Sequence, residues 1–507
     1  MKKTLIYTLG RHGYQESNQL EEANECVKMG HKVLYVSCDG SVGPCIQNPN
    51  WNKLTCIACV AEQKANNSKY LPAGVEQRFL EHYLTNQMGA LADNIRLSYS
   101  TIDDIKRLKY KGVDIGYGAV STYLSLTRNL NPKMNGRFKI YMDALLRMQI
   151  LLTEIGEKIM YSFNPELVVL YNGRLASVKP ILNLAEREGL NFICTENIVL
   201  KNNSIRKNHY YNETPHNISA NTQKYFDLWD KSEYSFSEKE NIARSFFERR
   251  RHALKTDDRS YTEAQELGLL PKDWDKSKRN FCIFNTSEDE FFSISEEFDR
   301  SNLFTNQLNG IRSITEKYAH DHSIHFYVRV HPNMSHITYK YHTSLYSLVA
   351  NNVTVIPADS SVSSYTLIDA CEKIIVFAST IGIEATYWGK PVISLSGTFY
   401  RDLDVVYYPK SKSELWGLID EKNLKYKYNL NVLKYAFFYI SGLHSDYEHV
   451  RYEYMNINLG IRKVRIHKKH NFFAFSVLHS IFLAFLLFLS KKLKLFSVFK
   501  DIPLEEE

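Results

Sequence analysis

Strand-like and helix-like segments alternate along both halves of this chain, and that alternation limits the folds open to it more than any other feature. In the first half, the apolar run Leu5–Leu9 is followed by a glycine-containing loop, a helical segment from about Glu16 to Met29 and a second apolar run, Lys32–Val36. Strands that alternate with helices form parallel sheets, whose ligands bind at the carboxyl ends of the strands. We therefore expect an α/β fold that carries its chemistry at strand ends.

The alternation continues to about residue 400 and falls into two halves. We expect further strands at 166–170, 192–195, 281–284, 325–330, 353–356, 373–377 and 392–395, with helices at 138–162, 177–188, 301–319, 364–371 and 382–388. A charged segment, 236–280, separates the halves. These patterns predict two doubly wound, Rossmann-type domains, 1–235 and 281–460, which are joined by the linker 236–280 and face a common cleft.

The formal net charge of +7 is concentrated in the tail 461–507, which holds nine lysines and arginines against four acids. The rest of the chain is nearly neutral, so a general nucleic-acid-binding surface is not expected. Within the tail, the 18 residues Phe472–Leu489 are apolar except for two serines and a histidine, and basic clusters flank both ends. We predict a C-terminal membrane-associated helix, peripheral or monotopic, with a buried core helix as the alternative.

The N-terminus runs from Met-Lys-Lys directly into the first strand pattern, without the apolar core and cleavage site of a signal peptide. We therefore expect a cytoplasmic protein whose eight cysteines are reduced. Four of them, Cys38, Cys45, Cys56 and Cys59, fall within 22 residues and end in a Cys-x-x-Cys pair. This spacing predicts either a structural zinc site or four unligated thiols. No cofactor is expected for the chemistry itself.

Two hydroxyl-bearing loops of the second half suit a phosphate group. The loop Asn285–Glu290, which contains Ser287, follows an expected strand, and Ser363 and Ser364 precede an expected helix. Hydroxyls and unbonded backbone N–H groups at such positions bind anions. The structural alternative is that these serines and acids cap the helices that follow them.

Two further motifs complete this set. His331 follows a strand and can donate to a phosphate oxygen, while Pro332 fixes the turn. Ser379 and Thr380 stand at another strand-to-helix turn, and Glu384 lies about one helical turn further on, where a carboxylate can accept from ribose hydroxyls.

In this order the motifs resemble the nucleotide-binding half of GT-B glycosyltransferases, particularly bacterial capsule and lipopolysaccharide biosynthesis proteins. The resemblance is carried by His331–Pro332, Ser360–Ser364 and the run from Phe377 to Pro391. Asn172–Arg174 with Glu196, and Asn285–Phe291, also resemble segments of capsule-synthesis proteins.

A His-Pro pair with a later Ser-Ser pair is also similar to bacterial sialyltransferases and Kdo transferases, in which both pairs contact CMP. The resemblance implies that His331, Ser363 and Ser364 hold a donor phosphate and that Glu384 holds the ribose. The segment Ser379–Ala385 also resembles enzymes that use UDP-sugars, so the nucleotide base stays open.

The first half is expected to supply the acceptor site and a general base. An inverting transfer needs a carboxylate or a histidine to take the proton of the acceptor hydroxyl. His12, Asp39 and Glu196 lie at expected strand ends and are the candidates, each with a structural role as its alternative. Arg174, close to Asn172 in a loop after a buried strand, suits a phosphate or carboxylate because its guanidinium is a planar fork.

The sequence therefore predicts a glycosyltransferase at the cytoplasmic face of the bacterial inner membrane. Its expected partners are a nucleotide-sugar donor, a lipid-linked capsule or lipopolysaccharide glycan, the membrane surface and other polysaccharide-assembly proteins. The alternatives are a glycerophosphotransferase or a nucleotide-sugar epimerase on the same fold, or a non-catalytic membrane-bound component of glycan assembly or export.

Overall fold

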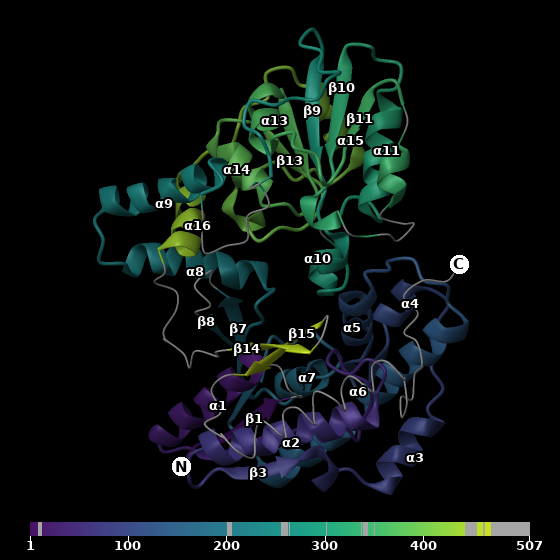
Figure 1. The fold of residues 1–507 in the computed structure, drawn as a ribbon, viewed down its shortest axis with the longest axis vertical. Helices are drawn as coiled ribbons and strands as arrows, with labels where there is room; N and C mark the ends of the chain where they lie inside the picture. Colours follow the sequence, from purple (N-terminus) through teal and green to yellow (C-terminus); the bar gives the residue numbers. More distant parts are fainter. Residues whose placement is uncertain are drawn as a thin grey trace. The chain divides into compact units, whose positions relative to one another are not determined.

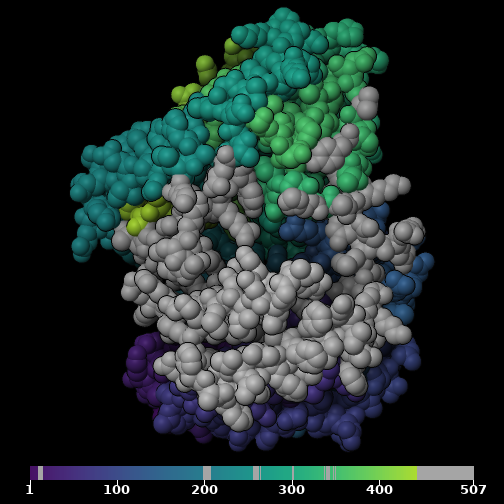
Figure 2. Space-filling model, viewed as in Figure 1, coloured from purple at the N-terminus to yellow at the C-terminus, as the bar shows by residue number. Residues whose placement is uncertain are grey.

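The computed structural model describes residues 1–8, 13–199, 205–254, 262, 264–300, 302–335, 337, 343–348, 350–441, 454–459 and 462–467. Figure 2 draws most of the described residues up to 441 in colour. The described chain divides into two compact units, and parallel sheets confirm the expected α/β class. The first unit comprises Met1–Arg128 and Pro132–Pro215 with the strands at 454–459 and 462–467, and the second comprises Asn129–Asn131 with His216–Ser445.

The first unit is built on a six-stranded sheet with the order β3-β2-β1-β6-β7-β8. Its strands are β1 (Lys3–Thr8), β2 (Lys32–Ser37), β3 (Glu76–Phe79), β6 (Leu167–Tyr171), β7 (Asn191–Val199) and β8 (Ile205–Tyr211). All neighbours are parallel except β7 and β8, which pair antiparallel. The order reverses between β1 and β6, and such a switch point is where open α/β sheets bind their ligands.

Helices cover both faces of the first sheet, so its central strands are buried on both sides. Ile6 of β1 packs on Leu20 and Ala23 of α1 (Gly13–Lys28), whereas its neighbours Leu5 and Tyr7 are buried from the opposite face. The other elements of this unit are α2 (Lys53–Tyr70), η1 (Leu80–His82), α3 (Asn86–Asn94), α4 (Ile102–Lys106), β4 (Lys109–Tyr110), β5 (Val113–Asp114), α5 (Gly116–Thr127), α6 (Gly136–Phe163), α7 (Lys179–Arg187), β14 (Tyr454–Leu459) and β15 (Arg462–His467).

The second unit holds a five-stranded parallel sheet with the order β11-β10-β9-β12-β13, which is doubly wound as predicted (Figure 1). The strands are β9 (Arg279–Phe284), β10 (Ile324–Arg329), β11 (Val353–Ile356), β12 (Lys373–Val376) and β13 (Val392–Ser394). Phe281 and Ile283 pack on one helical layer, and Cys282 and Phe284 pack on the other. The helices and turns are η2 (Glu288–Glu290), α10 (Glu296–Arg300), α11 (Gln307–Lys317), η3 (Pro332–Met334), η4 (Ser344–Ser347), α13 (Ser364–Ala370), α14 (Ile381–Tyr387), η5 (Arg401–Leu403) and α15 (Lys412–Asp420).

Three aromatic-rich helices, α8 (Ile218–Lys231), α9 (Phe236–Arg251) and α16 (Leu430–Ile440), lie together in the second unit (Figure 1). Tyr225 and Trp229 of α8 and Phe246 of α9 contact aromatic rings of α16. The boundary between the units falls at Pro215, whereas the sequence predicts 216–235 as part of the first domain and 236–280 as a linker. Although α9 is rich in charged residues, one face of the helix is apolar, and this face packs against the second unit.

The predicted tail helix, Phe472–Leu489, lies outside the described residues, so membrane contact stays a prediction. Residues 462–467, at the start of that tail, form β15, which pairs antiparallel with β14. Within the described part of the chain, no helix is both long and apolar enough to cross a bilayer.

Candidate functional site

A cavity of about 240 Å³ lies at the switch point of the first sheet, at the carboxyl ends of β1, β6 and β7. Three residues singled out from the sequence, Asn172, Arg174 and Glu196, meet in it. The rest of its wall is formed by Tyr7, Thr8, Gln15, Ile46, Tyr171, Leu175, Ser177 and Val178. The cavity combines a carboxylate, a guanidinium and several hydroxyl and amide groups, which is the mixture of groups that binds polar ligands.

Glu196 accepts three hydrogen bonds in this cavity. The Tyr171 hydroxyl donates to Oε1 at 2.5 Å, the Asn197 backbone N–H donates to Oε1 at 3.0 Å, and the Asn172 amide donates to Oε2. Burial raises the pKa of Glu196 above its ordinary value, although the three hydrogen bonds and the charge of Arg174 act in the opposite direction. The carboxylate therefore binds a proton more readily than an exposed glutamate does, as a general base requires.

The turn Asn172–Gly173 explains how the loop after β6 presents these groups. Both residues have left-handed backbones, with φ of 60° and 82°, and a Cβ on Gly173 would stand 2.6 Å from Leu182. Asparagine and glycine are the residues that adopt this conformation most easily. The Asn172 side chain accepts from the Arg174 N–H at 3.2 Å and donates to Glu196, so one amide links the base to the arginine loop.

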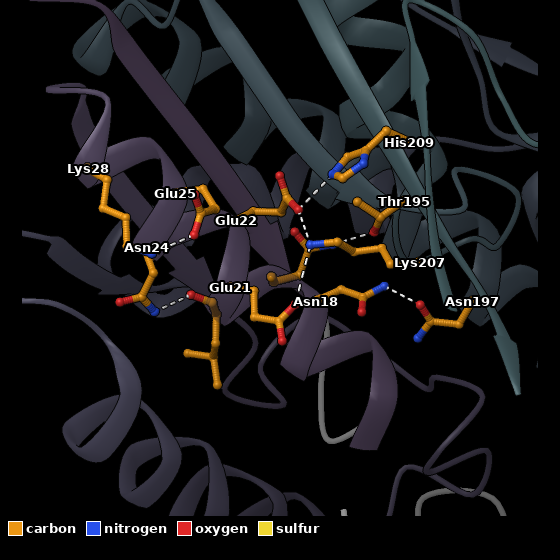
Figure 3. Close-up of polar contacts among 12 residues, drawn as sticks. Asn18, Glu21, Glu22, Asn24, Glu25, Lys28, Thr195, Asn197, Lys207 and His209 are labelled. Carbon is orange, nitrogen blue, oxygen red and sulfur yellow. Dashed lines mark hydrogen bonds and ion pairs between the residues drawn. The ribbon is translucent and has the colours of Figure 1, made fainter. Parts of the chain in front are cut away.

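Helix α1 holds both chain neighbours of Glu196 (Figure 3). Asn18 donates to the Asn197 side chain at 2.6 Å, and Gln19 donates to the Thr195 hydroxyl at 3.2 Å. Side chains alternate between the faces of a strand, so this anchoring on the α1 face directs Glu196 to the other face.

A buried ion cluster extends the same contact between α1 and the β7–β8 hairpin (Figure 3). The fully buried Lys207 ammonium pairs with Glu22 and lies 3.4 Å from Glu21, and His209 Nε2 lies 2.8 Å from Glu22 Oε1. Burial raises the pKa of Glu22, but the His209 hydrogen bond and the Lys207 charge outweigh it, so the net shift is downward. The cluster fixes the edge strand and, through it, the position of Glu196.

The other two candidate bases lie elsewhere. Asp39 follows β2, and both of its carboxylate oxygens accept hydrogen bonds from backbone N–H groups, from Ser41 N at 2.9 Å and from Glu81 N at 2.6 Å. This geometry favours the structural role for Asp39 that was the alternative from the sequence. His12 lies outside the described residues.

The four clustered cysteines are free thiols around the loop after β2. Cys38 Sγ accepts from Gly40 N at 3.2 Å, and Cys56 Sγ accepts from the Asn48 amide at 3.1 Å. Burial raises the pKa of Cys38, Cys45 and Cys56 above the ordinary value of a thiol. In the described residues, which include all four cysteines, no group of three or more histidine, cysteine, aspartate or glutamate side chains is placed to hold a metal ion. The choice between a zinc site and unligated thiols stays a prediction.

In the second unit, His331 lies at the carboxyl end of β10, and the loop after β9 holds it. Its backbone N–H donates to Asn285 Oδ1 at 2.8 Å, and its Nδ1 accepts from Asn333 N at 3.2 Å, so the ring proton is on Nε2. Burial, aided by the charge of Arg329, lowers the pKa of His331 to about 4. The imidazole is therefore neutral at pH 7 and acts as a hydrogen-bond donor, and Pro332 begins η3 directly after it.

The serines before α13 are engaged within the protein. Ser363 caps the helix, its Oγ accepting from Thr366 N at 3.2 Å, while its own N–H faces Leu269 O at 3.4 Å. The Ser364 N–H donates to Gln265 Oε1 at 2.8 Å. The capping alternative thus describes this motif better than a phosphate site does.

Glu384 also differs from its expected role. It is fully buried, where it pairs with Arg250 at 3.1 Å and accepts from the Tyr365 hydroxyl. Arg250 belongs to α9 and is far from Glu384 in the sequence, so no local sequence pattern predicts this ion pair. The carboxylate holds α9 against α14 rather than facing a ribose.

The remaining hydroxyl residues that the sequence predicts as donor-binding, Ser287, Ser379 and Thr380, lie in two different environments. Ser287 is buried and donates to Asp289 Oδ1 at 2.7 Å, which closes the turn η2. Ser379 and Thr380 lie between β12 and α14, beside the switch point of the sheet; Ser379 Oγ accepts from Ile381 N at 3.4 Å, and Thr380 is exposed. His331, Ser379 and Thr380 are therefore the groups at this strand edge best placed to meet an anion.

Two side chains that contact the candidate sites are not predicted as site residues by the sequence patterns. Tyr171 ends the apolar run of β6 and was counted as strand, yet its hydroxyl contacts Glu196. Arg329 ends β10 and is fully buried, where it donates to the carbonyl oxygens of Pro357 and Ser360 and adds positive charge beside His331. A tyrosine or arginine as the last residue of an apolar strand is the only signal that the sequence carries for either.

No protein-family model and no curated protein matches the sequence. Solved structures similar to this chain include the KpsC β-Kdo 2,4 transferase of Thermosulfurimonas dismutans, with 16% identity and a TM-score of 0.33 over 54% of this chain and 79% of that one. They also include the UDP-GlcNAc 2-epimerase of Methanocaldococcus jannaschii, with 12% identity and a TM-score of 0.26 over 87% and 99% of the chains.

A third similar structure is the Streptomyces glycosyltransferase SsfS6 in complex with thymidine diphosphate, with 10% identity and a TM-score of 0.21 over 87% of this chain and 96% of that one. At these TM-scores the similarity assigns no activity to this chain.

Proposed function

We propose that this chain is a glycosyltransferase that moves a sugar from a nucleotide-sugar donor, with CMP-sugars as the first candidates, to a lipid-linked capsule or lipopolysaccharide glycan. The observation that carries the proposal is Glu196, a carboxylate of raised pKa at the switch point of a parallel sheet.

In the proposed reaction, the cavity of the first unit receives the acceptor hydroxyl. Its oxygen bonds to the anomeric carbon while the bond from that carbon to the nucleotide phosphate breaks, and the electron pair leaves with the phosphate. Glu196 takes the hydroxyl proton, and its raised pKa keeps that transfer favourable near neutral pH. Arg174, within the same cavity, binds an anionic group of the substrate through its planar fork.

The second unit is assigned to the donor. The neutral His331 ring donates through Nε2–H to a phosphate oxygen, and Ser379 and Thr380 offer hydroxyls at the neighbouring strand end. A neutral donor binds phosphate without a titration near pH 7, so donor binding through His331 is expected to be independent of pH between about 5.5 and 8.

A donor screen tests this function. The purified chain is incubated with CMP-, UDP- and GDP-sugars and with CDP-glycerol, and nucleotide release is followed by chromatography. We expect release from one nucleotide-sugar class, stimulated by a lipid-linked glycan. Release of CMP from CDP-glycerol alone would identify a glycerophosphotransferase, and interconversion of a UDP-sugar without release would identify an epimerase; either result overturns the proposal.

A further inference from the structure

The first unit contains a second and larger hollow, of about 670 Å³, beside the cavity of Glu196. It opens at the carboxyl ends of β2 and β3, on the same sheet edge as the ends of β1 and β6. The loop after β2 borders both, with Ser41 in the hollow and Ile46 in the cavity. We call the hollow the α2 groove.

One face of α2 forms the floor of the α2 groove. The floor residues are Lys53, Cys56, Ile57, Val60, Ala61 and Lys64, which follow the helical spacing of three and four. This stripe is about 16 Å long at the rise of an α-helix. Ile57 in its middle is 60% exposed, so a large apolar side chain faces solvent.

The walls fix the shape of the groove. Trp51 stands on one side and donates through Nε1 to Gly40 O at 2.8 Å, and Phe79 of β3 stands on another. Gly40, with φ of 83°, packs so tightly on α2 that a Cβ there would stand 2.6 Å from the Cys56 Cβ. The groove is thus lined by two aromatic rings and an aliphatic floor, and Ser41 is the single hydroxyl group among its described lining residues.

Positive charge borders this apolar surface. Among the described residues, neither Lys53 nor Lys64 forms an ion pair with a carboxylate. Lys64 lies 5.3 Å from the centre of the Phe79 ring, at the end of the groove that also holds Glu81. The other acid of the lining, Asp39, lies beside Glu81: its two oxygens accept the backbone N–H groups of Ser41 and of Glu81. Because Lys64 contacts the Phe79 ring, we assign the anionic group of a ligand to Lys53.

We propose that the α2 groove binds an anionic amphiphile, with its apolar chain along the α2 floor and its phosphate on Lys53. Between the two lysines the floor is formed by Cys56, Ile57, Val60 and Ala61, and this apolar stripe matches an alkyl or prenyl chain. This inference rests on the proposed function. If the chain is a glycosyltransferase, the amphiphile is the lipid phosphate of the acceptor, held beside the cavity that receives the reacting hydroxyl.

Binding of dodecyl phosphate, below its micelle concentration, tests the groove without any turnover. Trp51 is the sole tryptophan of the first unit, so its fluorescence reports on the site. We expect saturable binding of dodecyl phosphate by calorimetry, with a fluorescence change that is lost in Trp51→Phe. Lys53→Met weakens binding about tenfold, as loss of a charge-assisted hydrogen bond does, while Lys69→Met, on the same helix but outside the groove lining, does not.

A second pair of variants tests the floor. Ile57→Asp abolishes binding, whereas Ile140→Asp, which replaces an isoleucine that is also 60% exposed in the same unit, leaves it unchanged. Equal binding of inorganic phosphate or of the neutral dodecyl maltoside contradicts the proposal, as does absence of binding.

The two proposals fail separately. If dodecyl phosphate does not bind while the donor screen succeeds, the groove proposal is wrong and the transferase proposal stands. If the groove binds while no nucleotide-sugar is consumed, the lipid site stands and its assignment to a transferase acceptor is wrong.

Discussion

The proton affinity of Glu196 reflects a balance between burial of its carboxylate and the hydrogen bonds that the carboxylate accepts. Burial raises the pKa, and the Tyr171 hydroxyl and the Asn172 amide each lower it. A general base acts in its deprotonated form, so the rate of transfer is expected to rise with pH as Glu196 loses its proton.

Replacing Tyr171 by phenylalanine removes one donor and should raise the pKa of Glu196 further. The acid limb of the pH–rate profile then moves to higher pH, by up to about one unit, with near wild-type rates above it. Tyr110→Phe is the matched control, because Tyr110 donates to Glu154 at 2.7 Å away from the cavity. An acid limb that stays in place, or moves to lower pH, contradicts the assignment of the limb to Glu196.

At the scale of single residues, the sequence predicts Asn172, Arg174 and Glu196 as candidate site residues because each lies at or just beyond the end of an expected strand. The same patterns also favour Asp39, which follows an expected strand, and Glu384, which lies about one turn into an expected helix. Those two carboxylates are taken up by the Glu81 N–H and by Arg250, and both partners come from distant parts of the chain.

At the scale of elements, the contact between α1 and the β7–β8 hairpin holds the candidate base in place. Its centre is Lys207, whose side chain is fully buried against Glu22. Lys207→Met leaves a buried carboxylate without its main cation and should lower the stability of the first unit by about 3–5 kcal/mol. Adding Glu22→Leu should restore most of it, since an apolar pair of similar volume is tolerated in such sites.

Hydrogen exchange of the α1 and β8 peptides, together with thermal unfolding, measures this loss. Lys231→Met is the control, because Lys231 pairs with Asp227 on the surface and should cost about 0.5 kcal/mol or less. The net pKa shift of Glu22 is downward, so its contribution to stability is present above the unfolded pKa of about 4.3 and is lost as the pH falls through the folded pKa. Unchanged exchange in Lys207→Met would show that the cluster does not anchor the hairpin.

Most strands of the two sheets could be predicted, because buried parallel strands are apolar runs bounded by glycine and polar residues. β3 was missed because its sequence, Glu-Gln-Arg-Phe, has no such run, and α2 was missed because its apolar face is only a narrow stripe. The sequence predicts α9 as part of a linker because eleven of its sixteen residues are polar or charged, whereas its aromatic face packs on α16.

At the scale of the whole molecule, two doubly wound sheets each carry polar side chains at their switch point. We assign base chemistry to the first unit and donor binding to the second. This division predicts different kinetic losses for variants in the two units: a variant of the base affects the chemical step, and a variant of His331 affects donor affinity.

The most direct test is the rate of sugar transfer by Glu196→Gln, measured at saturating donor together with the donor Kd. A lost general base should lower kcat by about 10²–10⁴-fold while the donor Kd stays within about twofold of wild type. His331→Ala should instead weaken donor binding, and Glu186→Gln, on the surface of the first unit, should change neither. A Glu196→Gln enzyme with wild-type kcat, or one whose loss is explained by weaker donor binding, would contradict the central claim.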